Sequence, residues 1–196
     1  MKKFYTTKFC RLCLNKKIKV GLKLVSMTLG EKYSKNQQDT KKSKKFPLSV
    51  GWCGKCKNVQ TMEIVDPKFL WSDFTYLTSQ TKAIVDHFKL LSKNIINKFK
   101  IRERDLIIDI GSNDGTFLNF FKKKNCKVLG VDPALNVVKI ARRKGITSIC
   151  SFFNKGVVKK IRKKYNKAKL ITCFNTFAHA PNMREIVFCI SEILDN

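Results

Sequence analysis

The second part of the chain alternates short, continuous apolar runs with segments in which apolar residues recur every three or four positions. The apolar runs predict four strands, at 106–110, 128–131, 146–150 and 170–174. The segments after each run predict helices, the last of which carries an apolar face over 183–194. Strands that are apolar along their whole length are buried on both faces, so this pattern predicts an α/β fold with a parallel, doubly wound sheet.

The first part of the chain has no comparable periodicity. The segment 32–45 is polar and indicates an exposed loop. A unit this small buries little apolar surface and usually needs a covalent or metal staple. Apolar residues at helical spacing over 79–99 predict one long amphipathic helix. We therefore expect a small domain at 1–78, a connecting helix within 79–104 and the α/β domain at 105–196.

Four of the eight cysteines form two pairs, Cys10-x-x-Cys13 and Cys53-x-x-Cys56. Two intervening residues let both thiolates of a pair reach one metal ion, and two pairs complete a tetrahedral site for Zn²⁺. The 39 residues between the pairs exceed the usual spacing, but the closure entropy of a loop grows only logarithmically with its length. A redox couple and chance pairing are the alternatives. We predict a structural zinc ion, since four thiolates leave no open coordination position.

The chain of 196 residues carries 41 Lys and Arg against 14 Asp and Glu, a net charge of +27 that favours anionic partners. Only seven of these cations are Arg, and the Lys are scattered, so nucleic acid is a weaker expectation than a solvated surface. No apolar run approaches the roughly 20 residues of a membrane helix, and the first ten residues lack the apolar core of a signal peptide. We expect a cytoplasmic protein with reduced cysteines.

The loop 111–115 follows the first predicted strand of the sheet, and Asp132 ends the second. Glycines in the loop let a ligand approach the backbone, and an acid at the next strand end suits a ribose diol. The loop lacks the GxGxxG pattern of a dinucleotide site, and Asp114 would oppose a diphosphate. S-adenosylmethionine has no phosphate and is cationic, so Asp109 and Asp114 favour it over NAD. A plain turn with a capping Asp is the alternative.

These residues resemble the sugar C-methyltransferases that act on nucleotide-linked keto-deoxysugars, which are class I S-adenosylmethionine-dependent enzymes with an N-terminal zinc-binding domain. The resemblance covers nearly the whole chain from Cys10 onward and includes motifs from both predicted domains. The motifs are Cys10-Arg11-Leu12-Cys13, Phe46-Pro47-Leu48, Val59-Gln60, 74–79, 110–116, 130–134, 145–147, Phe152-Phe153 and 175–179.

The resemblance implies a set of site residues and a reaction. The implied cofactor-binding residues are Asp109, Gly111, Asn113, Gly115, Asp132, Phe152, Phe153 and Asn175. In the family, the positions of Phe152 and Phe153 flank the adenine, and Tyr76 and His179 match an active-site Tyr and His that face the sugar. The family reaction removes a proton next to the keto group, and the enolate carbon then attacks the sulfonium methyl. Such chemistry needs a base, donors for the enolate oxygen and a dry site.

The sequence departs from the family at its end. A complete class I sheet has three more strands, and the family carries a further C-terminal domain with its main general base. We therefore expect an incomplete Rossmann-like class I methyltransferase sheet preceded by a small zinc-binding domain, and an isolated chain that is inactive. A fragment, a decayed copy and a split enzyme completed by another polypeptide are three open explanations. The alternative function is a catalytically inactive, zinc-stapled binding protein for RNA or another polyanion.

Overall fold

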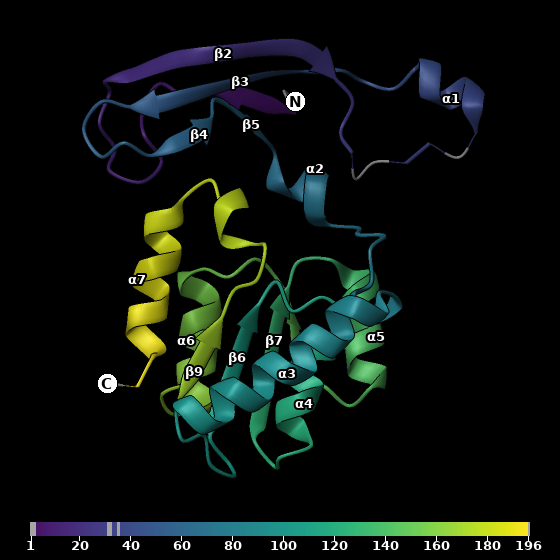
Figure 1. The fold of residues 1–196 in the computed structure, drawn as a ribbon, viewed down its shortest axis with the longest axis vertical. Coiled ribbons are helices and arrows are strands. Elements are labelled where there is room, and N and C mark those ends of the chain that lie inside the picture. The colour runs from purple at the N-terminus through teal and green to yellow at the C-terminus, as the bar shows by residue number, and fades with distance from the viewer. Residues whose placement is uncertain (1–2, 31–32, 35, 196) are drawn as a thin grey trace. The chain divides into compact units, whose positions relative to one another are not determined.

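A computed structural model describes residues 3–30, 33–34 and 36–195 (Figure 1). The chain divides into two compact units, which are described separately. The N-terminal unit comprises Met1–Leu70 and Pro181–Arg184, and the sheet unit comprises Trp71–Ala180 and Glu185–Asn196. The segment 71–78, which we expected in the small domain, thus belongs to the sheet unit.

The N-terminal unit is built from antiparallel strands of three to ten residues that the apolar pattern did not reveal. Its main sheet has the order β2-β3-β4, and a separate ladder joins β1 to β5. The strands are β1 (Phe4–Thr6), β2 (Ile18–Met27), β3 (Phe46–Cys53), β4 (Val59–Thr61) and β5 (Glu63–Val65). Among the described residues of this unit, few apolar side chains are buried, chiefly Phe46, Met62 and Ile64 beside the cysteines. A core of this size agrees with the need for a staple.

The polar segment 32–45 contains one helical turn where we expected a loop. Helix α1 (Gln37–Lys41) has no buried residue, and the Asn36 side chain caps it by accepting a hydrogen bond from the backbone N–H of Asp39. Such a cap satisfies one of the free N–H groups at a helix start, which explains a short helix without a core. Residues 32 and 35 of this segment lie outside the described part. Helix α2 (Pro67–Trp71) follows β5.

The sheet unit contains the four predicted strands in one parallel sheet, which confirms the α/β fold class. The strand order is β8-β7-β6-β9. The strands are β6 (Leu106–Ile110), β7 (Lys127–Asp132), β8 (Ser148–Cys150) and β9 (Leu170–Thr172). The chain runs from β6 through β7 to β8 on one side and then returns to pair β9 with the other side of β6. The carboxyl ends of β6 and β9 therefore form a topological switch point, where open α/β sheets bind their ligands.

Helices and short 3₁₀ turns connect and cover these strands; the periodicity predicted the α-helices but not the turns. They are η1 (Thr78–Gln80), α3 (Lys82–Lys98), α4 (Thr116–Lys122), α5 (Leu135–Arg143), α6 (Lys155–Lys164), η2 (Phe177–His179) and α7 (Met183–Ile193). Among the described residues, no helix combines the length and apolarity that crossing a membrane requires.

The two faces of the sheet have separate cores, because successive side chains of β6 point to opposite faces. Ile107 packs with Phe117 and Phe121 of α4 and with the apolar stripe of α3. Ile108 packs on the opposite face with side chains of α6 and α7. Figure 1 shows α3 and α4 together on one face of β6 and β7. Burial on both faces holds the carboxyl ends of the strands in place, which is what a ligand site at that edge requires.

Candidate cofactor site and metal centre

The four cysteines of the two predicted pairs lie together in the N-terminal unit. Their Sγ atoms all lie within 4.8 Å of one another. The Sγ atoms of Cys10 and Cys56 are 3.6 Å apart, as are those of Cys13 and Cys53. A tetrahedral zinc ion with bonds of about 2.3 Å holds its sulfur atoms about 3.8 Å apart. The cluster therefore has the spacing and the all-sulfur donor set of a closed, structural zinc site.

The two cysteine pairs share one backbone geometry. The N–H of Leu14 donates to the carbonyl of Cys10, and the N–H of Lys57 donates to the carbonyl of Cys53, both over 2.9 Å. Leu14 and Lys57 have φ angles of 61° and 63°. This left-handed conformation is usually left to Gly or Asn. Each pair thus ends in a turn that the residue types in the sequence do not signal.

Backbone donors stabilise the thiolate form of the buried cysteines. The N–H groups of Cys56 and then Lys55 lower the pKa of Cys53 to about 6, although burial opposes the shift. Burial also opposes the thiolate of Cys10, yet donation from the backbone of Cys13 and Leu12 leaves its pKa lowered. A metal ion binds thiolates, not thiols, so these donors favour metal binding by Cys53 and Cys10. The backbone of Asn58 acts to lower the pKa of Cys56, but burial and the neighbouring thiols raise it to about 12.

Asp132 lies in the sheet unit at the carboxyl end of β7 and is only 7% exposed. Its Oδ2 accepts from the backbone N–H of Asn113 and its Oδ1 from that of Ala134, each over 2.9 Å. Burial raises the pKa of this carboxyl, and the two donors act against that rise. Each carboxylate oxygen keeps a free lone pair, so the group can still accept from a ribose diol.

Asp109 lies on β6, one residue before the end of that strand, and is 4% exposed. Burial raises its pKa to about 7, and the nearby charge of Asp132 adds to the rise. The Thr172 hydroxyl donates to its Oδ1 over 2.7 Å and joins β6 to β9. Asp109 is thus a buried acid at the switch point with a pKa near neutrality. A cationic ligand bound there would favour its ionised form.

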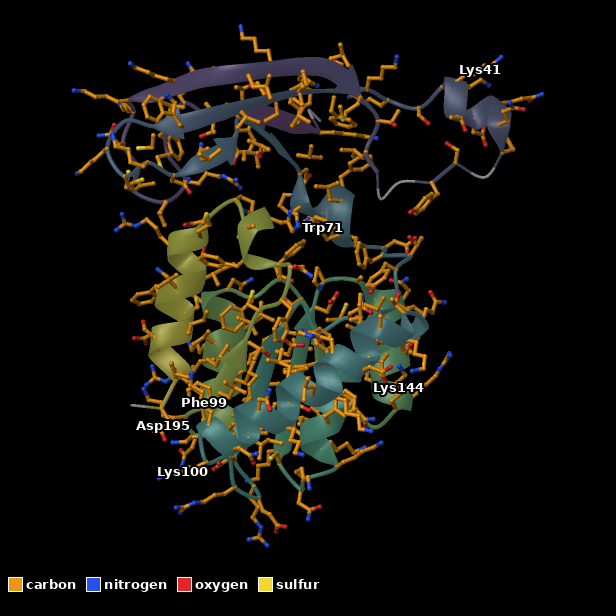
Figure 2. The ribbon with its side chains drawn as sticks, viewed as in Figure 1. Lys41, Trp71, Phe99, Lys100, Lys144 and Asp195 are labelled. Atoms are coloured by element: carbon orange, nitrogen blue, oxygen red, sulfur yellow. The ribbon has the colours of Figure 1, made fainter. Side chains whose placement is uncertain are left out.

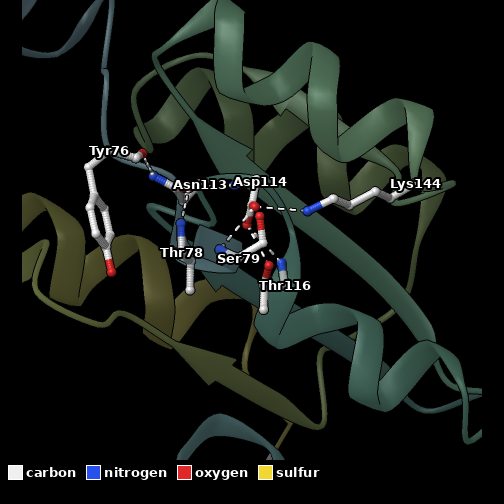
Figure 3. Close-up of polar contacts among 7 residues, drawn as sticks. All are labelled: Tyr76, Thr78, Ser79, Asn113, Asp114, Thr116 and Lys144. Carbon is white, nitrogen blue, oxygen red and sulfur yellow. Dashed lines mark hydrogen bonds and ion pairs between the residues drawn. The ribbon is translucent and has the colours of Figure 1, made fainter. Parts of the chain in front are cut away.

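We inferred that Asp114 faces the cofactor, but its carboxylate has a different role in the structure. Its carboxylate is fully buried. It accepts from Lys144 Nζ over 2.8 Å, from the backbone N–H of Ser79 over 3.2 Å, and from the hydroxyl and N–H of Thr116 (Figure 3). Burial raises the pKa of this carboxyl, but the donors, led by Lys144, outweigh burial and lower it. Asp114 therefore anchors the loop to residues before and after it in the sequence.

Asn113 is a second anchor, with a φ angle of 51°. Its Oδ1 accepts from the backbone N–H of Thr78 over 3.1 Å, and its Nδ2 donates to the carbonyl of Tyr76 over 3.0 Å (Figure 3). The side chain of Asn113, which the resemblance assigns to the cofactor, thus holds Tyr76 beside the loop. Its backbone N–H donates a hydrogen bond to Asp132. Asn113 therefore links Tyr76, the predicted catalytic residue, to the acid that is predicted to bind the ribose.

The glycines of the loop lie where other side chains come close to the backbone. Gly111 has a φ of 75°, and a Cβ at this position would overlap the Thr176 hydroxyl in the loop after β9. Gly115 has a φ of 74° and would meet Ile146. Both positions require glycine for conformation and for space. The loops after β6 and β9 therefore meet at the switch point.

The remaining predicted residues lie at the carboxyl ends of β8 and β9. Asn175 is exposed, with a φ of 49°. Phe152 is half-buried. Phe153 is only 8% exposed and belongs to the core cluster beneath α6, so its burial is explained without a ligand. Phe152 is consequently the more accessible of the two candidate adenine neighbours.

A row of aromatic rings, which the sequence did not predict, joins the two predicted catalytic residues. Tyr76 contacts Phe74 at 6.3 Å, Phe74 contacts Trp71 at 5.5 Å, and Trp71 contacts His179 at 5.2 Å between ring centroids. Asn136 of α5 fixes this segment: its Nδ2 donates to the carbonyl of Phe74 over 2.7 Å, and its Oδ1 accepts the N–H of Phe74. Nothing in the local pattern around Trp71 or Asn136 signals these contacts.

Two protein families match the chain, one in each part. Residues 83–195 match a family described as "Methyltransferase domain". Residues 10–71 match a family described as "Putative zinc binding domain". The first match supports S-adenosylmethionine as the cofactor of the sheet unit. The second match and the four-cysteine cluster support structural zinc.

The chain is also similar to one characterised enzyme and to solved structures. It is 29% identical over 149 residues to the C-methyltransferase NovU of Streptomyces niveus, and the match covers 76% of this chain and 36% of NovU. The chain thus spans about a third of that relative.

Two solved structures have lower identity. One is the plantazolicin methyltransferase BpumL with a pentazolic desmethylPZN analog and SAH, at 19% identity, a TM-score of 0.47, and coverage of 60% of this chain and 46% of that one. The other is a methyltransferase in complex with the Trm112 activator of Haloferax volcanii, at 17% identity, a TM-score of 0.47, and coverage of 60% and 52%.

Proposed function

Because the chain belongs to the methyltransferase-domain family, we propose that it forms part of an S-adenosylmethionine-dependent C-methyltransferase whose substrate is a nucleotide-linked keto-deoxysugar. The observation that carries this proposal is the similarity to NovU over 149 residues. That match is longer than the chain from Trp71 onward, so it includes part of the N-terminal unit as well as the sheet unit.

The cofactor site of this proposal lies at the carboxyl ends of β6 and β7. Bound S-adenosylmethionine would supply an electrophilic methyl group. Asp132 would accept from the ribose hydroxyls through its free lone pairs, and Gly111 and Gly115 would hold the loop in the conformation that lets it pack against Thr176 and Ile146 beside the ligand. Asp109 would lie close to the cationic end of the cofactor and interact with its charge. Phe152 and Asn175 would line the site at the neighbouring strand ends.

The catalytic part of the proposal rests on Tyr76 and His179. Both side chains are exposed, and the rings of Phe74 and Trp71 connect them. A Tyr hydroxyl can donate to the oxygen of a developing enolate, and a His can accept or hold the proton that leaves the sugar carbon. The clamps from Asn113 and Asn136 would restrict the segment that carries Tyr76, which is the preorganisation such a step needs.

We expect the chain to bind S-adenosylhomocysteine and to prefer it to NAD. Asp132→Ala should weaken this binding by about tenfold or more, since charge-assisted hydrogen bonds to the ribose are lost. Isothermal titration calorimetry measures both quantities. Asp132→Asn removes the charge and keeps an acceptor for one of the two backbone N–H groups, while its NH2 faces the other. Denaturant unfolding of both variants separates loss of binding from loss of fold. Asp195→Ala, an exposed acid in the same unit, is the matched control. Tighter binding of NAD would refute the cofactor assignment.

The substrate is tested by methyl transfer to a nucleotide-linked keto-deoxysugar, with the chain assayed alone and joined to the part of NovU that the match does not cover. We expect turnover in the joined protein. His179→Ala and Tyr76→Phe should each lower its turnover by about a hundredfold, the size of one acid–base or oxyanion contact. Binding of S-adenosylhomocysteine should remain in both variants. Full turnover in both variants would show that these side chains are not catalytic.

A further inference from the structure

A basic hollow lies at the amino end of the sheet, formed entirely by the sheet unit. Its volume is about 550 Å³. Residues at the starts of three strands line it: Arg104 to Leu106 before and on β6, Lys127 on β7 and Lys169 before β9. The last turn of α6 and the loop after it complete the wall. Asp195 also lines the hollow and is labelled, with Lys100, in Figure 2.

The lining is strongly positive. Seven of its twelve residues are Lys or Arg and two are Asp, Asp105 and Asp195. Of the seven cations, Arg162 has an acidic partner, Glu192, at 3.1 Å. Among the described residues, the other six form no ion pair. The Asp105 carboxylate accepts a hydrogen bond from the backbone N–H of Arg102. Like charges gathered around one hollow repel one another, which costs stability unless an anion offsets the repulsion.

Local structure explains only some of these cations. Arg162, Lys163 and Lys164 lie in the last turn of α6, where positive charges stabilise the helix dipole. No helix end accounts for Lys127, Lys167 or Lys169. Lys127 and Lys169 precede or begin strands, and both are exposed. These three residues are separated by up to 42 positions in the sequence, and the parallel sheet brings them to one place.

The hollow is separate from the proposed cofactor site. Its strand residues lie at the amino ends of β6 and β7, whereas Asp109 and Asp132 lie at or next to the carboxyl ends. Five residues of an extended strand span about 13 Å. A ligand in the hollow would therefore not be the cofactor or the sugar substrate, and its binding can be measured independently.

We propose that this hollow binds a small polyphosphorylated anion. Lys side chains bind phosphate groups as point charges, and the volume suits one small ligand. Nucleic acid is less well matched, because Tyr165 is the one aromatic residue of the lining and a single ring makes no stacking platform for successive bases. Several Lys side chains line one open hollow, so the site favours dense charge on a compact molecule.

Inorganic tripolyphosphate is the probe for this site. Calorimetry with the full chain should detect its binding. The triple variant Lys127→Gln, Lys167→Gln, Lys169→Gln should weaken binding by about tenfold or more and lower the salt dependence, since three phosphate contacts are lost. A matched triple variant, Lys89→Gln, Lys93→Gln, Lys139→Gln, removes the same charge from exposed positions of α3 and α5 and should change the affinity less than about twofold.

Two further measurements complete the test. Affinity for S-adenosylhomocysteine should be the same in both triple variants, which shows that the sheet unit is folded and keeps this result apart from the proposed enzyme function. A short single-stranded RNA is the competing ligand. Equal weakening by both triple variants, tighter binding of RNA than of tripolyphosphate, or no tripolyphosphate binding by the parent chain would each overturn the proposal.

Discussion

Simultaneous replacement of Cys53 and Cys56 by serine is expected to abolish zinc binding and to unfold the N-terminal unit. The two remaining thiolates cannot hold a structural zinc ion, whose binding contributes about 10–16 kcal/mol of apparent free energy in small metal domains. The unit has few buried apolar side chains to replace that contribution. Metal analysis should find one zinc per parent chain and none in the variant. Hydrogen exchange should show lost protection over β3 and β4.

The matched control is the double variant Cys150→Ser, Cys173→Ser. It removes the same number of thiols from the sheet unit, where neither belongs to the four-cysteine cluster. Its zinc content should equal that of the parent. Zinc retained after the loss of both Cys53 and Cys56 would show that the metal lies elsewhere.

Replacement of Asp114 by alanine is expected to lower the free energy of unfolding of the sheet unit by about 1–3 kcal/mol, because the buried N–H and hydroxyl donors of Thr116 lose their acceptor. The change leaves Lys144, Ser79 and Thr116 without their acceptor. Lys144→Met should cost less, because Asp114 keeps three donors and Lys144 is 35% exposed. Denaturant unfolding measures both values.

The effect of Asp114 should depend on pH in a defined direction. The folded state lowers the pKa of this carboxyl below its usual 3.8. Its contribution to stability is therefore complete above that value and is lost as pH falls through the folded pKa. The stability difference between the parent and Asp114→Ala should be constant near neutral pH and shrink in acid. A difference that stays the same into strong acid, or equal losses in Asp114→Ala and Lys144→Met, would contradict the buried anchor.

The sequence determined the parts whose signals lie in neighbouring positions. The apolar runs predicted the four strands of the sheet, because burial on both faces demands apolar residues in succession. The spacing of two cysteine pairs predicted the metal cluster, because the two residues within each pair already place its two thiolates close together. The positions of Gly111 and Gly115 followed from the strand-loop-helix pattern. Apart from the meeting of the two cysteine pairs, these features needed no knowledge of which distant residues meet.

Only the tertiary structure decided which groups partner one another across the chain. Asp114 is 35 residues from Ser79 and 30 from Lys144, and its three kinds of donor turn it from a candidate ligand contact into an anchor. Trp71 reaches His179 because the sheet brings the segment before α3 next to the loop after β9. The lysines of the basic hollow converge for the same reason. Charge and ring contacts of this kind depend on how the tertiary fold brings distant segments together, and local periodicity does not encode that arrangement.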